Sequence, residues 1–208
     1  IGYLLKIPRI FNSVTGLGSF YIQETPRAKI VRYILEKLYF VSFSIANNVS
    51  FQNSEDMNLF IEKGLVKKSK AILIRGSGID MEEFAPQERN KETKEITVLM
   101  IARAIWDKGV REYYEAANIL KGENIKFLYV GDIDKGNISS ANIEFMKNGN
   151  VTYLGHRDEI KELISESDIF VLPSYREGLP RTLLEASALK KAIITSDTTG
   201  CREVVEDG

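Results

Sequence analysis

The sequence predicts an α/β fold in which helices cover both faces of a parallel sheet, and three observations point to it. Five short apolar runs recur in the second part of the chain, at 96–101, 125–130, 151–154, 169–172 and 192–195. These runs are continuous rather than alternating, which is typical of parallel strands buried on both faces. Stretches with a helical pattern separate them, so strand and helix alternate as in a doubly wound, Rossmann-like domain with right-handed crossovers.

The stretches between the runs predict four helices, at 110–120, 140–147, 158–165 and 181–190. The chain stops soon after the fifth strand and the short stretch Gly200–Val205, so we expect this sheet to lack its final elements. Because the sequence opens at Ile1 rather than at a methionine, we expect a fragment that is cut at both ends.

The first 85 residues predict a different unit, again of α/β type. Pro26 begins a long helix that we expect to reach Asn47. A second helix is capped by Ser54-Glu55-Asp56, runs through Glu62 and is ended near Gly64. Two strands are expected, and two strands cannot close a sheet by themselves. They lie at 49–52 and 71–75.

The polar stretch Ala85–Glu95 (APQERNKETKE) has the composition of a linker. We therefore predict three parts. Residues 1–85 are the C-terminal part of an N-terminal domain, residues 86–95 are the linker, and residues 96–208 are a second domain truncated at its end.

Composition excludes several classes of protein. The 208 residues hold 28 Lys and Arg against 29 Asp and Glu, a balance that argues against a nucleic-acid binder. A lone cysteine, Cys201, allows no internal disulfide, and with a single His156 a zinc site has too few ligands. No run of about 18 apolar residues is present, so the sequence predicts no membrane span.

Two cations follow the first strand of the second domain. Arg103 and Lys108 lie in the loop that opens the next helix, at the carboxyl end of a strand, where doubly wound sheets bind ligands. A diphosphate carries about two negative charges, which two cations near free helix amides would match. The alternative is a solvated Arg and Lys in an ordinary loop.

Two glutamates flank the start of the helix expected at 181–190. Glu177 lies in the loop after a buried strand, Gly178 allows the backbone to approach a ligand, and Pro180 pre-sets the first helical turn. An acidic pair beside helix amides, which favour anions, suggests a ligand with both phosphates and hydroxyls, such as a sugar nucleotide. The alternative is that Glu177 caps the helix and Glu185 is a surface residue.

Two further motifs are less specific. Gly78, in the turn Arg75–Asp80, could form the floor of a cleft between domains. The sequence Asp132-Ile133-Asp134 has the Asp-x-Asp form of metal-dependent transferases, but those enzymes have another fold, and here the motif reads as a polar loop. We therefore expect no metal site and no cofactor.

Together these segments resemble glycosyltransferase family 4, the retaining transferases of the GT-B fold. Ile169–Ala188 (IFVLPSYREGLPRTLLEASA) is similar to the family's signature of two glutamates separated by seven residues. Arg103 and Lys108 are similar to its phosphate-binding pair, Gly76–Asp80 to its interdomain segment, and Phe51–Asp56 to the end of its N-terminal domain. Within the family, the chain resembles bacterial enzymes that extend sugars linked to undecaprenyl diphosphate.

The resemblance implies a role for each matching residue. Arg103 and Lys108 would neutralise the leaving diphosphate, and these two residues and Glu177 would form the catalytic set. Glu177 would bind donor-sugar hydroxyls near the developing positive charge, and Glu185 would hold the ribose. The remaining donor-binding residues would be Gly78, His156, Arg157, Gly178, Leu179, Pro180 and Thr182, with the backbone around His156 and Arg157 flanking the nucleobase.

The resemblance also implies a function. We expect a retaining, metal-independent hexosyltransferase that moves a hexose or N-acetylhexosamine from a UDP-sugar to a lipid-linked or polysaccharide acceptor in bacterial envelope biosynthesis. The fragment itself is expected to be inactive. The alternatives are a sugar-nucleotide epimerase of GT-B fold, an inactive binding fragment, and a nicotinamide dehydrogenase. The last is disfavoured because no Gly-x-Gly-x-x-Gly follows the strand at 96–101.

The basic, aromatic helix at 26–47 adds an expectation about location. A helix of this composition can lie on an anionic membrane surface, which would suit a lipid-linked acceptor. It could equally pack on an N-terminal sheet with its basic side chains in solvent. We expect a cytoplasmic protein, peripheral on the inner face of the membrane, with no nucleic-acid partner.

Overall fold

A computed structural model describes residues 6–86 and 94–206, so most of the predicted linker lies outside the described residues. The chain divides into two compact units. The first runs to Ser77 and includes the short segment Arg176–Leu179, and the second comprises Gly78–Tyr175 and the residues from Pro180 onward. Residues 78–85 thus group with the second unit, where Phe84 is buried in the core.

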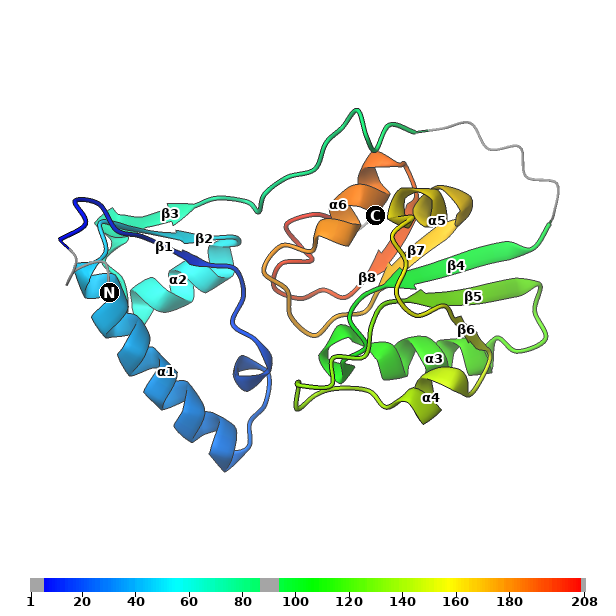
Figure 1. Ribbon diagram of the computed structural model, residues 1–208, viewed down its shortest axis with the longest axis horizontal. Helices are drawn as coiled ribbons and strands as arrows, with labels where there is room; N and C mark the ends of the chain where they lie inside the picture. The colour runs from blue at the N-terminus through cyan, green and yellow to red at the C-terminus, as the bar shows by residue number, and fades with distance from the viewer. Residues whose placement is uncertain (1–5, 87–93, 207–208) are drawn as a thin grey trace. The chain divides into compact units, whose positions relative to one another are not determined.

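The first unit contains a three-stranded parallel sheet, in the order β1-β2-β3 (Figure 1). Its strands are β1 (Phe11–Val14), β2 (Asn48–Phe51) and β3 (Ala71–Leu73). The two-strand prediction was wrong because β1 carries no apolar run: its sequence is Phe-Asn-Ser-Val, and of its four residues Val14 alone is buried.

Two helices connect these strands. Helix α1 (Pro26–Ile45) begins at the predicted proline, and Thr25 caps it by accepting a hydrogen bond from the Ala28 amide at 3.2 Å. Helix α2 (Ser54–Glu62) ends at Glu62 as predicted, but Ser54 is its first residue rather than part of its cap. The Asn53 side chain caps it instead by accepting the Asp56 amide at 2.7 Å. Two short 3₁₀ turns complete the unit, η1 (Ser19–Tyr21) and η2 (Lys68–Lys70).

An aromatic cluster forms the core of the first unit. Phe60 is fully buried, and its ring centroid lies 5.2 Å from that of Tyr39, 5.4 Å from that of Phe51 and 6.0 Å from that of Phe43. These rings come from α1, β2 and α2, so one side chain joins both helices to the sheet.

The second unit contains a five-stranded parallel sheet in the order β6-β5-β4-β7-β8. Its strands are β4 (Ile96–Ile101), β5 (Ile125–Val130), β6 (Val151–Tyr153), β7 (Ile169–Leu172) and β8 (Ala192–Thr195). Four of the five have the predicted bounds, because continuous apolar runs mark a strand that is covered on both faces.

Helices cover both faces of this sheet, α3 and α4 on one face and α5 and α6 on the other (Figure 1). Each is shorter than predicted; their bounds are α3 (Val110–Ile119), α4 (Ile143–Lys147), α5 (Ile160–Glu166) and α6 (Arg181–Ala188). The predicted start of α4 at residue 140 was too early, because the Asn142 side chain accepts the Phe145 amide at 2.7 Å and thereby caps the helix. A 3₁₀ turn, η3 (Trp106–Lys108), precedes α3.

The doubly wound α/β arrangement predicted from residue 96 onward is therefore present. Among the described helices, none has the length and hydrophobicity needed to cross a bilayer.

Candidate active site

The topology of the second sheet marks a position for ligand binding. From β4 the chain winds outward through β5 and β6, and it then returns to place β7 on the other side of β4. The loops that follow β4 and β7 therefore leave the sheet in opposite directions, and ligands of such folds bind in the crevice at this point. Both loops carry predicted site residues.

The loop after β4 is held by buried apolar residues and by a glycine. Ala104 and Ile105 are buried, and the Trp106 ring packs edge-on against Phe145 with centroids 4.9 Å apart. Gly109 has φ of 77°, and a Cβ there would lie 2.1 Å from the carbonyl oxygen of Pro173 in the loop after β7. Glycine is thus required where the two loops meet.

Hydrogen bonds join the same two loops. The Tyr175 amide donates to the Asp107 carbonyl at 3.0 Å, and the Ser174 hydroxyl donates to the same carbonyl at 3.2 Å. The Ser139 hydroxyl donates to the Asp107 carboxylate at 2.7 Å. Because Ser174 is fully buried, these contacts fix the loop backbone on either side of the switch point.

The predicted phosphate-binding cations lie on this fixed loop. The Arg103 side chain is 61% exposed, and its Nη1 donates to Asp134 Oδ2 at 2.8 Å. Lys108 is partly buried at the end of η3, directly before Gly109. The loop conformation therefore places both cations at the carboxyl edge of the sheet.

Helix α6 begins directly after the loop that follows β7. The sequence suggested that Pro180 forms part of the first helical turn. In the structure Pro180 has an extended conformation and occupies the N-cap position, directly before the first helical residue. Thr182 is partly buried in the first turn.

Glu185 is 6% exposed, so the interpretation as a surface residue is wrong. Burial raises its pKa, and Glu83 adds to the shift, whereas Arg181 opposes it. The Arg181 Nε atom lies 2.9 Å from Glu185 Oε1, one helical turn away. Sequence reasoning missed Arg181, although its spacing of four residues from Glu185 was a usable signal.

Three predicted site residues, Glu177, Gly178 and Leu179, group with the first unit. There the Gly178 carbonyl accepts a hydrogen bond from Asn53 Nδ2 at 2.9 Å. A Cβ on Gly178 would lie 2.0 Å from the Thr15 carbonyl oxygen, so a side chain has no room at this position.

The neighbouring Arg176 forms an ion pair with Asp56, whose side chain is 2% exposed. Asn53 also donates to this carboxylate at 3.1 Å. Sequence reasoning missed the group of Asn53, Asp56 and Arg176, because Arg176 lies 120 residues from Asp56 and no local spacing signals the contact.

His156 and Arg157 follow β6. The His156 ring lies between two carboxylates, with Nδ1 3.2 Å from Asp132 and Nε2 3.2 Å from Asp158. The Gly131 amide donates to the Gly155 carbonyl at 2.9 Å and thus joins the loops after β5 and β6. Gly78, the first residue of the second unit, is exposed and has φ of 67°.

Both carboxylates of the Asp-x-Asp motif have side-chain partners. Asp134 pairs with Arg103, and Asp132 faces His156. Within residues 6–86 and 94–206, no three His, Cys, Asp or Glu side chains gather as a metal site.

Solved structures share this fold. HepE of Anabaena, in complex with UDP-glucose, matches with a TM-score of 0.76 and 16% identity over 99% of this chain and 58% of that chain. The sucrose-phosphate synthase of Thermosynechococcus elongatus matches with a TM-score of 0.74 and 21% identity over 97% of this chain and 54% of that one. The predicted fold class, Rossmann-like α/β units of GT-B type, is confirmed.

Sequence relatives give more detail. The chain is 43% identical to the N,N'-diacetylbacillosaminyl-diphospho-undecaprenol alpha-1,3-N-acetylgalactosaminyltransferase of Campylobacter jejuni, over 97% of this chain and 56% of the relative. It is 26% identical to the UDP-Gal:alpha-D-GlcNAc-diphosphoundecaprenol alpha-1,3-galactosyltransferase of Escherichia coli, over 95% of this chain and 54% of the relative. The chain thus spans about half the length of these curated relatives.

The profile of the family "Glycosyl transferases group 1" matches residues 81–208, which include the whole five-stranded sheet and the loops at its switch point. With this match and with a relative at 43% identity along nearly all its length, the chain belongs to the glycosyl transferases group 1 family.

Proposed function

We propose that the protein is a retaining glycosyltransferase that moves a hexose or N-acetylhexosamine from a UDP-sugar to a lipid-linked saccharide. One observation carries the proposal: Arg103 and Lys108 stand at the switch point of the second sheet, on a loop whose backbone is bonded to the loop after β7. The names of the relatives, which transfer sugars to undecaprenol-linked diphosphates, support the acceptor class.

The site would act mainly by electrostatic stabilisation. Negative charge grows on the donor diphosphate as the bond to the sugar breaks, and cations fixed beside it stabilise the transition state without reorganising. Arg103 and Lys108 would supply this charge. In the proposed retaining reaction a donor phosphate oxygen takes the acceptor proton on the same face, so no protein nucleophile is required.

The other predicted residues would orient the donor. Glu185 would accept hydrogen bonds from the ribose hydroxyls, and Thr182 with the backbone of Gly178, Leu179 and Pro180 would bind phosphate or sugar oxygens. Glu177 would stand near the reacting sugar carbon. The backbone of His156 and Arg157 would flank the nucleobase, and Gly78 would complete the donor site.

The reaction would proceed without a metal ion. Metal-independent transfer is supported by the contacts of the two Asp-x-Asp carboxylates, which face Arg103 and His156. Side-chain cations would then neutralise the diphosphate. Transfer that persists in a chelator is the expected result.

A transfer assay tests the proposal. The intact protein is incubated with UDP-sugars and an undecaprenyl-diphosphate-linked saccharide, and release of UDP is measured together with the extended lipid product. Arg103→Ala and Lys108→Ala should each lower kcat/KM by roughly one to two decades, because one charged hydrogen bond contributes about 1.5–3 kcal/mol. Unchanged kinetics in both variants would show that Arg103 and Lys108 are solvated loop residues without a role in donor binding.

We also propose peripheral contact with the inner face of the cytoplasmic membrane through residues 26–47. Of the twenty residues of α1, two are buried, Ala28 and Phe43. Its exposed face is largely apolar; the exposed large side chains are Ile30, Tyr33, Ile34, Leu38, Phe40, Val41 and Ile45. The exposed cations Arg27, Lys29 and Lys37 accompany them, and this combination favours an anionic lipid surface.

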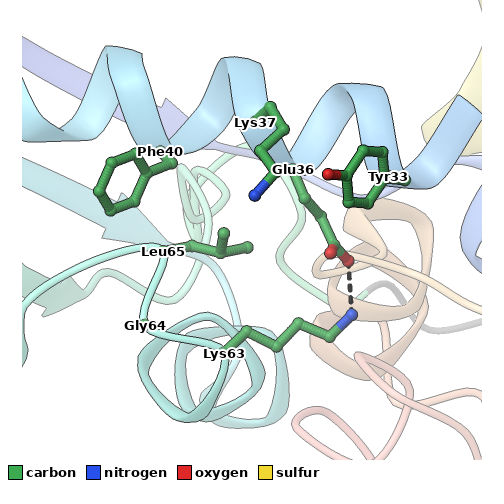
Figure 2. Close-up of a pocket in the computed structure, with 7 residues that line it drawn as sticks. All are labelled: Tyr33, Glu36, Lys37, Phe40, Lys63, Gly64 and Leu65. Atoms are coloured by element: carbon green, nitrogen blue, oxygen red, sulfur yellow. Dashed lines mark hydrogen bonds and ion pairs between the residues drawn. The ribbon is translucent and has the colours of Figure 1, made fainter.

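A groove of about 280 Å³ borders this face (Figure 2). Tyr33, Lys37 and Phe40 of α1 line one side of it, and Lys63 and Leu65 line the other. Glu36 also lines the groove and pairs with Lys63 at 2.5 Å. The apolar side chains and Lys37 continue the exposed helix face, and this supports one continuous lipid-binding surface.

Vesicle sedimentation tests the membrane contact. Leu38→Asp should reduce binding of the intact protein to vesicles that contain anionic lipid, because it places a negative charge in the apolar face. The matched control is Ile119→Asp in α3, since Ile119 is 82% exposed in the second unit. Equal losses in both variants, or no loss in Leu38→Asp, would contradict the contact.

A further inference from the structure

The Asp-x-Asp motif after β5 touches two residues of the proposed donor site. Asp134 Oδ2 lies 2.8 Å from Arg103 Nη1, and Asp132 Oδ2 lies 3.2 Å from His156 Nδ1. Asp134 therefore faces a side chain that the proposed function assigns to the donor diphosphate, and Asp132 faces the ring of a residue whose backbone it assigns to the nucleobase.

The loop that carries Asp134 is firmly held. A Cβ on Gly131, where φ is 145°, would lie 1.8 Å from the Ala102 carbonyl oxygen, so glycine alone fits there. The Ala104 amide donates to the Asp132 carbonyl at 2.8 Å, and the Asn137 amide donates to the Asp134 carbonyl at 2.9 Å. The backbone of Asp132, two residues before Asp134, is thus bonded to the loop that carries Arg103, and the Asp134 carbonyl closes a turn within its own loop.

Exposure distinguishes the two partners. The Asp134 side chain is 31% exposed and the Arg103 side chain 61%. Asp134 is therefore the anchored member of the pair, and Arg103 is the long side chain that reaches into solvent. A guanidinium has five N–H donors, so one bond to Asp134 leaves it able to bind a phosphate as well.

We propose that Asp134 is the counter-charge of the arginine that binds the donor diphosphate. It holds the Arg103 guanidinium at the carboxyl edge of the sheet and neutralises part of its charge. A nucleoside diphosphate must then bind Arg103 beside a fixed carboxylate, so that the product leaves more readily than it would from an unpaired cation. This role rests on the proposed function, because it acts through Arg103.

Calorimetric titration of the intact protein with UDP and with uridine tests the role. Asp134→Asn should tighten UDP binding about two- to fivefold, the range expected for one partly exposed charge pair. Uridine binding should not change, since uridine has no phosphate. The gain should shrink as salt is added, because salt screens exposed charges. Asp134→Glu, which keeps the charge, should stay near the wild-type affinity.

The matched control is Glu123→Gln, which removes the same charge from an exposed residue before the amino end of β5, at the opposite edge of the sheet. It should leave UDP affinity unchanged. In an Arg103→Ala background, Asp134→Asn should lose its effect, because the arginine through which it acts is gone.

Several results would overturn the inference. One is a UDP affinity that does not rise in Asp134→Asn, and another is a rise that persists at full size without Arg103. A loss of affinity that depends on Mg²⁺ or Mn²⁺ would make the motif a metal site instead. If Arg103→Ala weakens UDP binding but Asp134→Asn does not tighten it, this inference alone is wrong. If Arg103→Ala has no effect, the proposed donor role of Arg103 is wrong.

Discussion

Glu185 lies on α6 with 6% of its surface exposed and with Arg181 as an ion-pair partner. Burial raises its pKa because the charged form loses hydration that one exposed arginine does not replace. A carboxylate whose pKa is raised by burial beside a specific charge partner is a candidate functional residue.

The raised pKa predicts how stability depends on pH. Between the usual value of 4.5 and the raised value, the folded protein binds more protons than the unfolded chain, so stability falls as pH rises through this window. Glu185→Gln should therefore melt at or above the wild-type temperature at pH 7, and its advantage should disappear as pH falls toward 4.5. Thermal melts across this range test it, with exposed Glu162→Gln as the control, whose difference from wild type should not vary. An advantage independent of pH would contradict the prediction.

Glu177 differs from Glu185 in its proposed task, and kinetics can separate the two. Glu177→Gln removes a negative charge near the carbon where positive charge should develop, so it should lower kcat more than it raises KM. Glu185→Gln should act mainly on KM for the donor. Steady-state kinetics of both variants check this, and if both change KM alone, Glu177 does not act at the reacting centre.

At the scale of elements, the sequence predicted best where burial produces a simple pattern. Strands β4, β5, β7 and β8 are continuous apolar runs, and their bounds are as predicted. Strand β1 was missed because two of its four residues are polar and they interrupt any apolar run; pairing with β2 rather than a hydrophobic pattern makes it a strand.

For the candidate site too, the sequence predicted some features and not others. Local spacing indicated Arg103, Lys108 and the glutamates after β7, since each stands at a strand end. Local spacing could not indicate the contacts that site residues make across the chain: Asp134 contacts Arg103 across 31 residues, and Asn53 contacts Gly178 across 125. Such contacts exist only once the chain is folded.

Helix caps give a prediction at this scale. Asn53 caps α2 and is 1% exposed, with further bonds to Asp56 and to the Gly178 carbonyl. Asn53→Ala should cost about 1–3 kcal/mol, because it removes a cap and leaves buried polar groups unpaired. Asn142, which caps α4 from an exposed position, is the matched control, and Asn142→Ala should cost about 1 kcal/mol or less. Chemical denaturation measures both, and equal costs would contradict the role of the buried bonds.

At the scale of the whole molecule, the chain has two hydrophobic cores with no residue in common among the described residues. The smaller core surrounds Phe60 in the first unit, and the larger one lies on both faces of the five-stranded sheet. Each unit therefore depends on its own buried apolar area.

Hydrogen exchange can test this separation. Phe60→Ala removes a fully buried ring of α2 that contacts α1 and β2, and the loss should be about 3–5 kcal/mol. The amides of β1, β2 and β3 should then exchange faster, while those of β4 and β5 keep their protection, because local opening follows the unit whose core is weakened. Ile164→Ala on α5 is the reciprocal variant, since Ile164 is fully buried in the second core, and it should leave β1 to β3 protected. If either substitution accelerates exchange equally in both sheets, the two cores unfold as one cooperative unit.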